Sequence, residues 1–355
     1  MKFFSLFSGI GGFELGFEKV GNNRFWETGG RSIRPRRNKS DNKRCGRAGE
    51  GMSCVGGEGE LGFERASDQE LWVKKWEKSS LRGQCNSSIA SKSIQRQYST
   101  CVGFSEIDKY AIQVYKRHFP DHTNFGDATR IVPEQLPEFD MLVGGFPCQI
   151  FSIAGKRKGM SGEDTRGTLF FEIYRIARSR RPKLLLLENV PGLLSSRDGE
   201  DFLTILRSLD EIGYDVEWDC YNTKDFRLPQ NRERIFIVGH LRGTGGGKVF
   251  PIERKNSKSC IEIGTITEIQ GNDILKRCYS ANGSIPALNT HAGGNTESKF
   301  LLGNRIRRLT PTECERLQGF PDGWTKGVSD TQRYKLLGNA VTVNVIEAIA
   351  RRILE

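Results

Sequence analysis

The first twenty residues contain a strand, a glycine-rich turn and a helix in direct succession, and this unit restricts the fold more than any other part of the sequence. Lys2–Leu6 is an apolar run, several glycines follow it, and Phe13–Lys19 has helical periodicity. Such a turn lets a ligand approach the backbone amides at the start of a helix. The sequence therefore predicts an α/β fold in which helices cover both faces of a sheet.

A long segment separates this unit from the second strand. In folds of this kind an acidic residue ends the second strand about 20 residues later, yet Cys101–Ser105 and Glu106 come only after residue 100. Residues 22–100 contain 16 Lys and Arg against 9 Asp and Glu, and they show no sustained periodicity apart from a short helix predicted at Gln69–Lys78. We interpret 22–100 as a mostly disordered insert in a helix-to-strand loop. Such a loop lies at the amino-end edge of the sheet, opposite the edge formed by the carboxyl ends of the strands.

The rest of the chain alternates helices and strands. Helices are predicted at Asp108–His118, Thr168–Arg178, Phe202–Ile212 and Val341–Leu354. Strands are predicted at Asp140–Val143, Lys183–Leu187, Val216–Asn222 and Ile235–Gly239, with a third strand of the series ending at Asp127. We expect 1–21 and 101–242 to form a catalytic domain, 243–305 a small β-rich domain, and 306–355 a return to the catalytic domain.

Composition excludes several classes of protein. No apolar stretch approaches the ~18–20 residues that span a membrane, and the N-terminus lacks the pattern of a signal peptide, so we expect a cytoplasmic protein. The nine cysteines include no CxxC pair and no Cys/His spacing typical of a metal site, which predicts neither bound metal nor a disulfide framework. The formal net charge of +11 suits a polyanionic partner, but the predicted insert contributes most of it.

A thiol and a carboxyl group each follow a predicted strand. Gly144–Gln149 puts Cys148 in a tight loop after Asp140–Val143, and Glu188 follows Lys183–Leu187. Ligands bind at the carboxyl ends of strands in open α/β sheets. A nucleophilic thiol beside a carboxyl acid indicates a covalent active site, although a single loop cysteine is more often a buried thiol.

Eight short motifs extend this pattern along nearly the whole chain. In order they are Phe7–Gly12, Glu106, Asp127, Pro147–Gln149, Glu188–Val190, Gln230–Arg234, Arg316–Pro321 and Gly338–Val341. By these motifs the chain resembles the DNA (cytosine-5) methyltransferases of bacterial restriction-modification systems. The resemblance implies a Rossmann-like S-adenosylmethionine-dependent methyltransferase sheet and a small irregular target-recognition domain at 243–305. It also implies methyl transfer from S-adenosyl-L-methionine to carbon 5 of a flipped-out cytosine in specific double-stranded DNA sites.

The chemistry of that reaction accounts for the catalytic residue types. Carbon 5 becomes nucleophilic after a thiolate adds at carbon 6, which suits Cys148. Glu188 would protonate or hydrogen-bond ring nitrogen 3. By resemblance, Arg234 contacts the target base and Arg232 supports the loop; their alternation at a strand start puts both on one face. A pair of solvated charges is the alternative for the two arginines.

The resemblance also implies binding residues. Those for the cofactor are Phe7, Gly9, Gly11, Gly12, Glu106, Ile107, Asp127, Pro147, Leu169, Asn339 and Val341. Those for DNA are Lys156, Arg157 and Lys158 in the loop after the cysteine, and Arg277, Tyr279, Gly293 and Gly294 in the small domain. In this scheme Glu106 accepts from the ribose hydroxyls and Asp127 from the adenine amino group.

The resemblance further implies the partners. They are double-stranded DNA and, as a functional pairing without direct contact, a restriction endonuclease; the chain itself is expected to be a monomer without a metal. Two alternatives remain open. One is a cytosine-5 methyltransferase of the same fold that acts on transfer RNA, and the other is a catalytically silent DNA-binding homologue disabled by the insert.

Overall fold

The computed structural model describes residues 1–21, 99–147, 169–254, 262–265, 277–280, 283–288, 290, 299–302 and 305–355. Residues 22–98 of the predicted insert, with the helix predicted at Gln69–Lys78, lie outside this part of the chain. Met1–Asn23 and Ile94–Glu355 belong to one compact unit, so the first strand and the last helix are parts of the same body.

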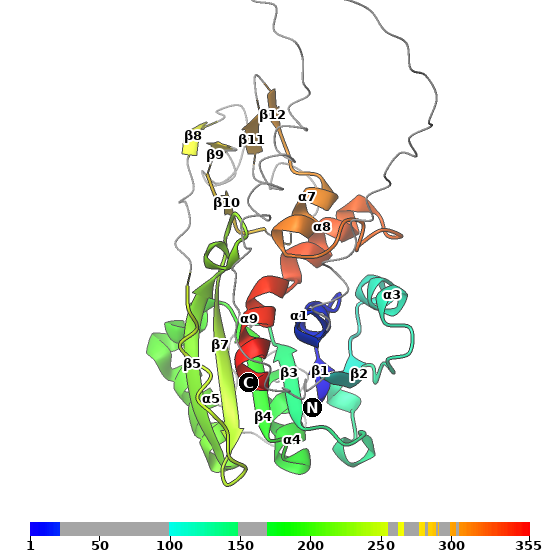
Figure 1. Cartoon of the computed structure of the whole chain (residues 1–355), viewed down its shortest axis with the longest axis vertical. Helices are drawn as coiled ribbons and strands as arrows, with labels where there is room; N and C mark the ends of the chain where they lie inside the picture. Colours follow the sequence, from blue (N-terminus) through cyan, green and yellow to red (C-terminus); the bar gives the residue numbers. More distant parts are fainter. Residues whose placement is uncertain are drawn as a thin grey trace, which may run out of the picture. The chain divides into compact units, whose positions relative to one another are not determined.

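A six-stranded sheet forms the centre of this unit, in the order β2-β1-β3-β4-β7-β5 (Figure 1). Its strands are β1 (Lys2–Leu6), β2 (Thr100–Ser105), β3 (Met141–Gly145), β4 (Leu184–Asn189), β5 (Tyr214–Asn222) and β7 (Glu233–Leu241). Strands β2, β1, β3 and β4 are parallel, whereas β7 runs antiparallel to both β4 and β5. The carboxyl ends of the four parallel strands therefore lie at one edge, together with the start of β7.

Helices surround the sheet in the described part of the chain. The α-helices are α1 (Gly12–Gly21), α3 (Lys109–His118), α4 (Leu169–Arg180), α5 (Glu200–Glu211), α7 (Pro311–Leu317), α8 (Asp330–Asn339) and α9 (Val343–Leu354). Short 3-10 helices lie at Ala128–Arg130, Pro133–Gln135, Pro191–Leu194, Ser196–Gly199 and Thr223–Phe226. Among the described residues, no helix has both the length and the apolar character needed to cross a membrane.

Alternate side chains of the central strands enter two hydrophobic cores, one on each face of the sheet. Phe4 and Leu142 pack with apolar residues of α4 and α5, whereas Phe3 and Met141 pack with those of α1 and α9. The period of two is that of a strand buried on both sides. The predicted fold class, an α/β sheet with helices on both faces, is confirmed.

Helices α1 and α9 approach each other closely because α1 has a glycine at the contact. A Cβ on Gly16 would come within 2.6 Å of the Ile346 Cβ. The first helix of the chain is thereby packed against the last one, as Figure 1 shows in blue and red. This contact brings the C-terminal segment beside the glycine-rich turn that precedes α1.

A second, smaller sheet has the order β12-β11-β9-β8. Its strands are β8 (Glu262–Thr265), β9 (Arg277–Ser280), β11 (Lys299–Leu302) and β12 (Arg305–Arg307). Tyr279 and Phe300 form a small apolar core with Ile285 and with Leu317 of α7. In addition, β10 (Ile285–Pro286) pairs with β6 (Gln230–Asn231), which precedes β7. The described segments of 243–305 contain short strands, as expected for a β-rich region.

One predicted strand is wrong. Instead of a strand ending at Asp127, the segment makes a single isolated bridge between Asn124 and Phe104. The Asn124 side chain accepts hydrogen bonds from the backbone N–H groups of Glu106 and Gly126, and Gly126 has a φ of 73°. Asparagine side chains that bond to nearby backbone groups favour turns over strands. Asp127 then caps a 3-10 helix by accepting from the Thr129 N–H.

Candidate active site

The turn after β1 forms one wall of the site. Phe7, Gly9 and Gly11 have φ values of 54°, 55° and 86°, so the backbone reverses sharply before α1 begins. A Cβ on Gly9 would meet no atom within 4 Å, which leaves the backbone there open to a ligand. By contrast, a Cβ on Gly12 would lie 2.6 Å from Val341 Cγ1, so this glycine is needed for packing.

The carboxylate of Glu106, at the end of β2, ties the turn to the next strand. Its Oε2 accepts from the Gly9 N–H at 2.9 Å, and its Oε1 accepts from the backbone N–H groups of Ile107 and Asp108 at 2.8 and 2.9 Å. Three backbone donors therefore fix the orientation of the carboxylate. The two predicted cofactor residues Gly9 and Glu106 are in direct contact.

An ion pair joins the end of β4 to the start of β7. The Arg234 Nε is 3.1 Å from Glu188 Oε1, and the two side chains are 20% and 13% exposed. Burial raises the pKa of the Glu188 carboxyl group, while Arg234 and Arg232 oppose that rise. A Cβ on Gly145 would be 2.9 Å from Glu188 Oε2, so the glycine at the end of β3 makes room for this carboxylate.

Arg232 is buried and holds three backbone segments together. Its guanidinium donates to the carbonyls of Leu288 at 3.2 Å and of Gly338 and Ala340 at 3.0 Å each. Burial and the neighbouring Arg234 lower the pKa of Arg232 to about 9, which still leaves a cation at neutral pH. Arg232 thus fixes the turn after α8 against the start of β7.

These elements enclose a cavity of about 520 Å³, a size typical of small-molecule sites. The predicted site residues that line it are Phe7, Gly9, Glu106, Pro147, Glu188, Arg232, Arg234 and Asn339. They come from the ends of β1, β2, β3 and β4, the start of β7 and the end of α8. Residues predicted for catalysis and for cofactor binding therefore face one common space.

The cavity also has lining residues to which the sequence analysis gave no role, among them Asp108, Asn189 and Leu288. Asp108 caps α3 and pairs with Lys335 Nζ at 2.8 Å. Asn189 Nδ2 donates to the Phe146 carbonyl at 3.1 Å, which fixes the backbone just before the cysteine loop. The position of Asn189 directly after Glu188 was the available signal for it; no local pattern marks Leu288.

Comparison with known proteins identifies the family. A model of the C-5 cytosine-specific DNA methylase family matches residues 87–299 and 252–355. The Type II methyltransferase M1.ScrFI of Lactococcus lactis subsp. cremoris is 40% identical over 284 residues, which cover 71% of each chain. The chain belongs to the C-5 cytosine-specific DNA methylase family. The Type II methyltransferase M.HhaI of Haemophilus parahaemolyticus is 33% identical over 287 residues, 71% of this chain and 87% of that one.

Solved structures show the same fold at lower sequence identity. The S. pombe Dnmt2 methyltransferase superposes with a TM-score of 0.60 at 16% identity, covering 100% of this chain and 98% of the other. A putative DNA modification methyltransferase encoded within an E. coli prophage gives 0.59 at 16% identity, covering 99% and 98%. The predicted methyltransferase fold is confirmed. As a member of the methylase family, the chain is a DNA cytosine-5 methyltransferase.

The methylase structure leaves some predicted binding residues outside the cavity wall. The cofactor residues concerned are Gly11, Gly12, Ile107, Asp127, Leu169 and Val341. Ile107 is 72% exposed, and the Asp127 carboxylate bonds to Thr129, which lowers its pKa. Their cofactor roles stay predictions.

The predicted catalytic cysteine and most predicted DNA contacts lie outside the described residues. They are Cys148, Lys156, Arg157, Lys158, Gly293 and Gly294, and the side chain of Arg277 is likewise not described. Tyr279 is 6% exposed and packs against Phe300 with ring centroids 6.1 Å apart. Its ring therefore supports the small sheet and offers little surface to DNA. In the described part of the chain no three His, Cys, Asp or Glu side chains gather as metal ligands.

Proposed function

We propose that this chain transfers a methyl group from S-adenosylmethionine to carbon 5 of a flipped-out cytosine in specific double-stranded DNA sites, through a covalent adduct of Cys148 at carbon 6. One observation carries the proposal. The Glu188–Arg234 pair and the glycine turn with Glu106 line the same cavity of about 520 Å³. An acid and a cofactor-binding turn that share one space suit a reaction between a bound base and a bound methyl donor.

The wall formed by Phe7, Gly9 and Glu106 fits the cofactor. The open side of Gly9 would admit the ligand close to the backbone, and Phe7 supplies an apolar surface. The Glu106 carboxylate, already oriented by backbone N–H groups, has acceptor capacity left for ribose hydroxyls. When bound there, S-adenosylmethionine would supply an electrophilic methyl group on a sulfonium.

The opposite wall suits the target base. Burial raises the pKa of the Glu188 carboxyl group, a shift that favours a role as proton donor to ring nitrogen 3. The Arg234 ion pair would hold this carboxyl group in one orientation, and Arg232 would keep the start of β7 in place.

Cys148 directly follows Pro147, which lines the cavity. In the proposed reaction its thiolate forms a sulfur–carbon bond at carbon 6 while Glu188 donates to ring nitrogen 3. Once carbon 5 has gained the methyl group, the donor would be left as a neutral thioether and the carbon 5 proton would pass to a base. The sulfur–carbon bond then breaks, and the proton on ring nitrogen 3 returns to Glu188. The thiolate is regenerated, and the net change is one methyl group gained and one proton lost by the cytosine.

The DNA substrate follows from the family and from geometry. A cytosine stacked in a duplex cannot reach the side chains that line the cavity, so the base would be extruded at a cost of a few kcal/mol. The Type II names of the relatives support a role as the modification enzyme of a restriction-modification system. In this proposal the chain acts as a monomer, and its partner endonuclease recognises the same sites without touching it.

Methyl transfer measured on two nucleic acids tests the proposal. The purified chain is incubated with tritiated S-adenosylmethionine and either plasmid DNA or transfer RNA, and the DNA product is then mapped by bisulfite sequencing. We expect label in DNA, on carbon 5 of a cytosine within one short sequence. Label in transfer RNA alone would favour the transfer-RNA enzyme, and cofactor-independent DNA binding without any label would favour the silent homologue.

A further inference from the structure

A tryptophan near the C-terminus is bonded to the glycine turn of the proposed cofactor site. The Trp324 Nε1–H donates to the carbonyl of Ile10 at 2.9 Å, across 314 residues of sequence. Ile10 is 1% exposed and Trp324 is 7% exposed, so water has little access to this bond. The turn is therefore held on two sides, by Glu106 at the Gly9 N–H and by Trp324 at the Ile10 carbonyl.

Helix α3 fixes the loop that carries Trp324 through its carbonyl groups. Arg117 donates to the carbonyl of Gly323 at 2.8 Å and to those of Trp324 and Lys326. His118 Nε2 lies 2.8 Å from the Trp324 carbonyl, which accepts only, so the histidine is the donor. The His118 ring also stacks on the indole, with centroids 3.5 Å apart and an interplanar angle of 2°.

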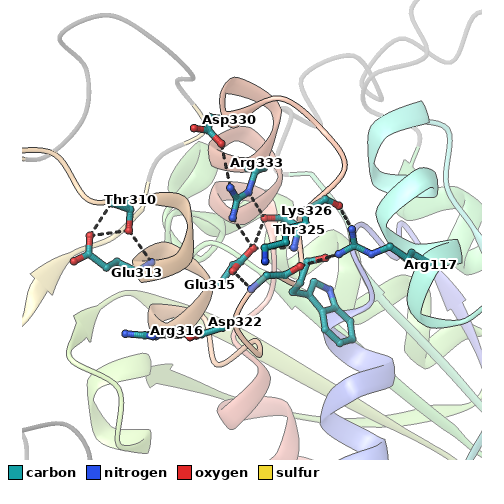
Figure 2. A network of polar contacts seen from close by, with 12 residues as sticks. Arg117, Thr310, Glu313, Glu315, Arg316, Asp322, Thr325, Lys326, Asp330 and Arg333 are labelled. Carbon is teal, nitrogen blue, oxygen red and sulfur yellow. Dashed lines mark hydrogen bonds and ion pairs between the residues drawn. The ribbon is translucent and has the colours of Figure 1, made fainter. Parts of the chain in front are cut away.

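Helix α7 fixes the same loop by accepting hydrogen bonds from the backbone N–H groups of the loop. The Glu315 carboxylate is fully buried and accepts from the backbone N–H groups of Gly323 at 2.6 Å and Thr325 at 2.8 Å. Arg333 of α8 balances the charge of Glu315, with its Nη2 3.1 Å from Glu315 Oε1. Figure 2 shows the Glu315 carboxylate joined to both Thr325 and Arg333, with Arg117 reaching the loop from α3. The loop backbone is thus bonded from two opposite sides.

The geometry points to Trp324 as a positioning residue for cofactor binding, an inference that rests on the function proposed above. Its indole N–H holds the peptide group between Ile10 and Gly11 in the conformation that opens the turn to the cavity. Arg117, His118 and Glu315 act through Trp324 by holding its loop. Without the indole donor, the buried Ile10 carbonyl loses a partner, and the turn samples other conformations that bind the cofactor less well.

Trp324→Phe tests this role because it keeps an aromatic ring on His118 and removes the N–H donor, together with part of the packed volume of the indole. Tyr214→Phe is the matched control: the Tyr214 hydroxyl is also a buried donor to a backbone carbonyl, that of Pro182 at 2.6 Å, and Tyr214 does not line the cavity. Both variants are made in the full chain. Cofactor affinity is measured by calorimetry, stability by urea unfolding, and KM and kcat by methyl transfer to DNA.

We expect Trp324→Phe to raise both the Kd and the KM for S-adenosylmethionine by about three- to tenfold, part of the cost of one buried hydrogen bond, while kcat changes less than twofold. Tyr214→Phe should lower the urea midpoint to a similar extent and change the Kd by less than twofold. If Trp324→Phe loses stability like Tyr214→Phe but keeps the wild-type Kd, the inference is overturned. If the wild-type chain itself binds no S-adenosylmethionine, the proposed function fails and this inference fails with it.

A second variant covers the case in which Trp324→Phe does not fold. Arg117→Gln removes donors to the loop carbonyls from the side of α3, and Arg181→Gln, which removes a donor to the Ile212 carbonyl, is its control. We expect a weaker cofactor affinity, in the same direction, for Arg117→Gln alone. Equal affinities for the two arginine variants would overturn the inference.

Discussion

Replacing Glu14 by glutamine should remove a pH dependence of stability that this one carboxyl group creates. Glu14 lies in the first turn of α1 and is 1% exposed. The Tyr115 hydroxyl donates to its Oε1 at 3.1 Å, while Oε2 has no hydrogen-bond partner among the described residues. Burial is the main cause that raises the Glu14 pKa from its ordinary 4.5 to about 7.

The sign of the effect follows from the raised pKa. In the unfolded chain Glu14 ionises near pH 4.5, but in the folded chain it stays protonated until the pH approaches 7. The folded state therefore binds the extra proton between these values, and the stability present below pH 4.5 is lost as the pH rises through 7. Each pH unit corresponds to about 1.4 kcal/mol, so the whole interval amounts to about 3 kcal/mol.

Urea unfolding of the wild type and Glu14→Gln at pH values from 4.5 to 8.5 measures this effect. The difference between the two free energies of unfolding cancels the groups that both proteins share, and it should shift in favour of Glu14→Gln by up to about 3 kcal/mol across the series. Tyr115→Phe should move the transition to higher pH, because the Tyr115 hydrogen bond lowers the Glu14 pKa. A difference that stays constant with pH would refute the reasoning.

Three further predictions concern the site and the insert. Glu106→Gln should weaken S-adenosylmethionine binding by about 1–3 kcal/mol in calorimetry, the scale of a disturbed buried hydrogen bond; an unchanged affinity would show that Glu106 serves the fold alone. Glu188→Gln should lower kcat for methyl transfer by about 100-fold, the scale of general acid catalysis, with cofactor affinity unchanged; full activity would exclude Glu188 as the acid. Joining Gly21 to Cys101 through a short linker should keep turnover within a few-fold and preserve stability, since long loops add little closure cost; an inactive shortened chain would make 22–100 part of the folded domain.

The site was predictable where topology brings strand ends together. Gly9, Glu106 and Pro147 each follow a parallel strand, Glu188 lies near the carboxyl end of another, and the carboxyl ends of such strands share one edge of the sheet. A local pattern was therefore enough to place them near one another. Asn339 was predictable only through the family resemblance, because it reaches the cavity from the far end of the chain.

The parts that sequence missed depend on contacts between distant segments. The Trp324 bond to Ile10 joins a C-terminal loop to the first turn, and no periodicity or spacing announces it. The strand expected before Asp127 is absent because the Asn124 side chain bonds to two backbone N–H groups and forms a turn. Leu288 follows β10, between two strands of the small sheet, and reaches the cavity where Arg232 and Gln230 contact its backbone.

Covalent capture at the target base tests the central claim most directly. Once the methylated site is mapped, a duplex with 5-fluorocytosine at that position is incubated with S-adenosylmethionine and the wild-type chain or Cys148→Ser. Fluorine at carbon 5 blocks the proton loss that releases the enzyme, so the wild type should form a stable protein–DNA adduct, and peptide mass analysis should place it on Cys148. Methylation of ordinary DNA by the wild type with no adduct on the fluorinated duplex, or an adduct formed by Cys148→Ser, would contradict the account.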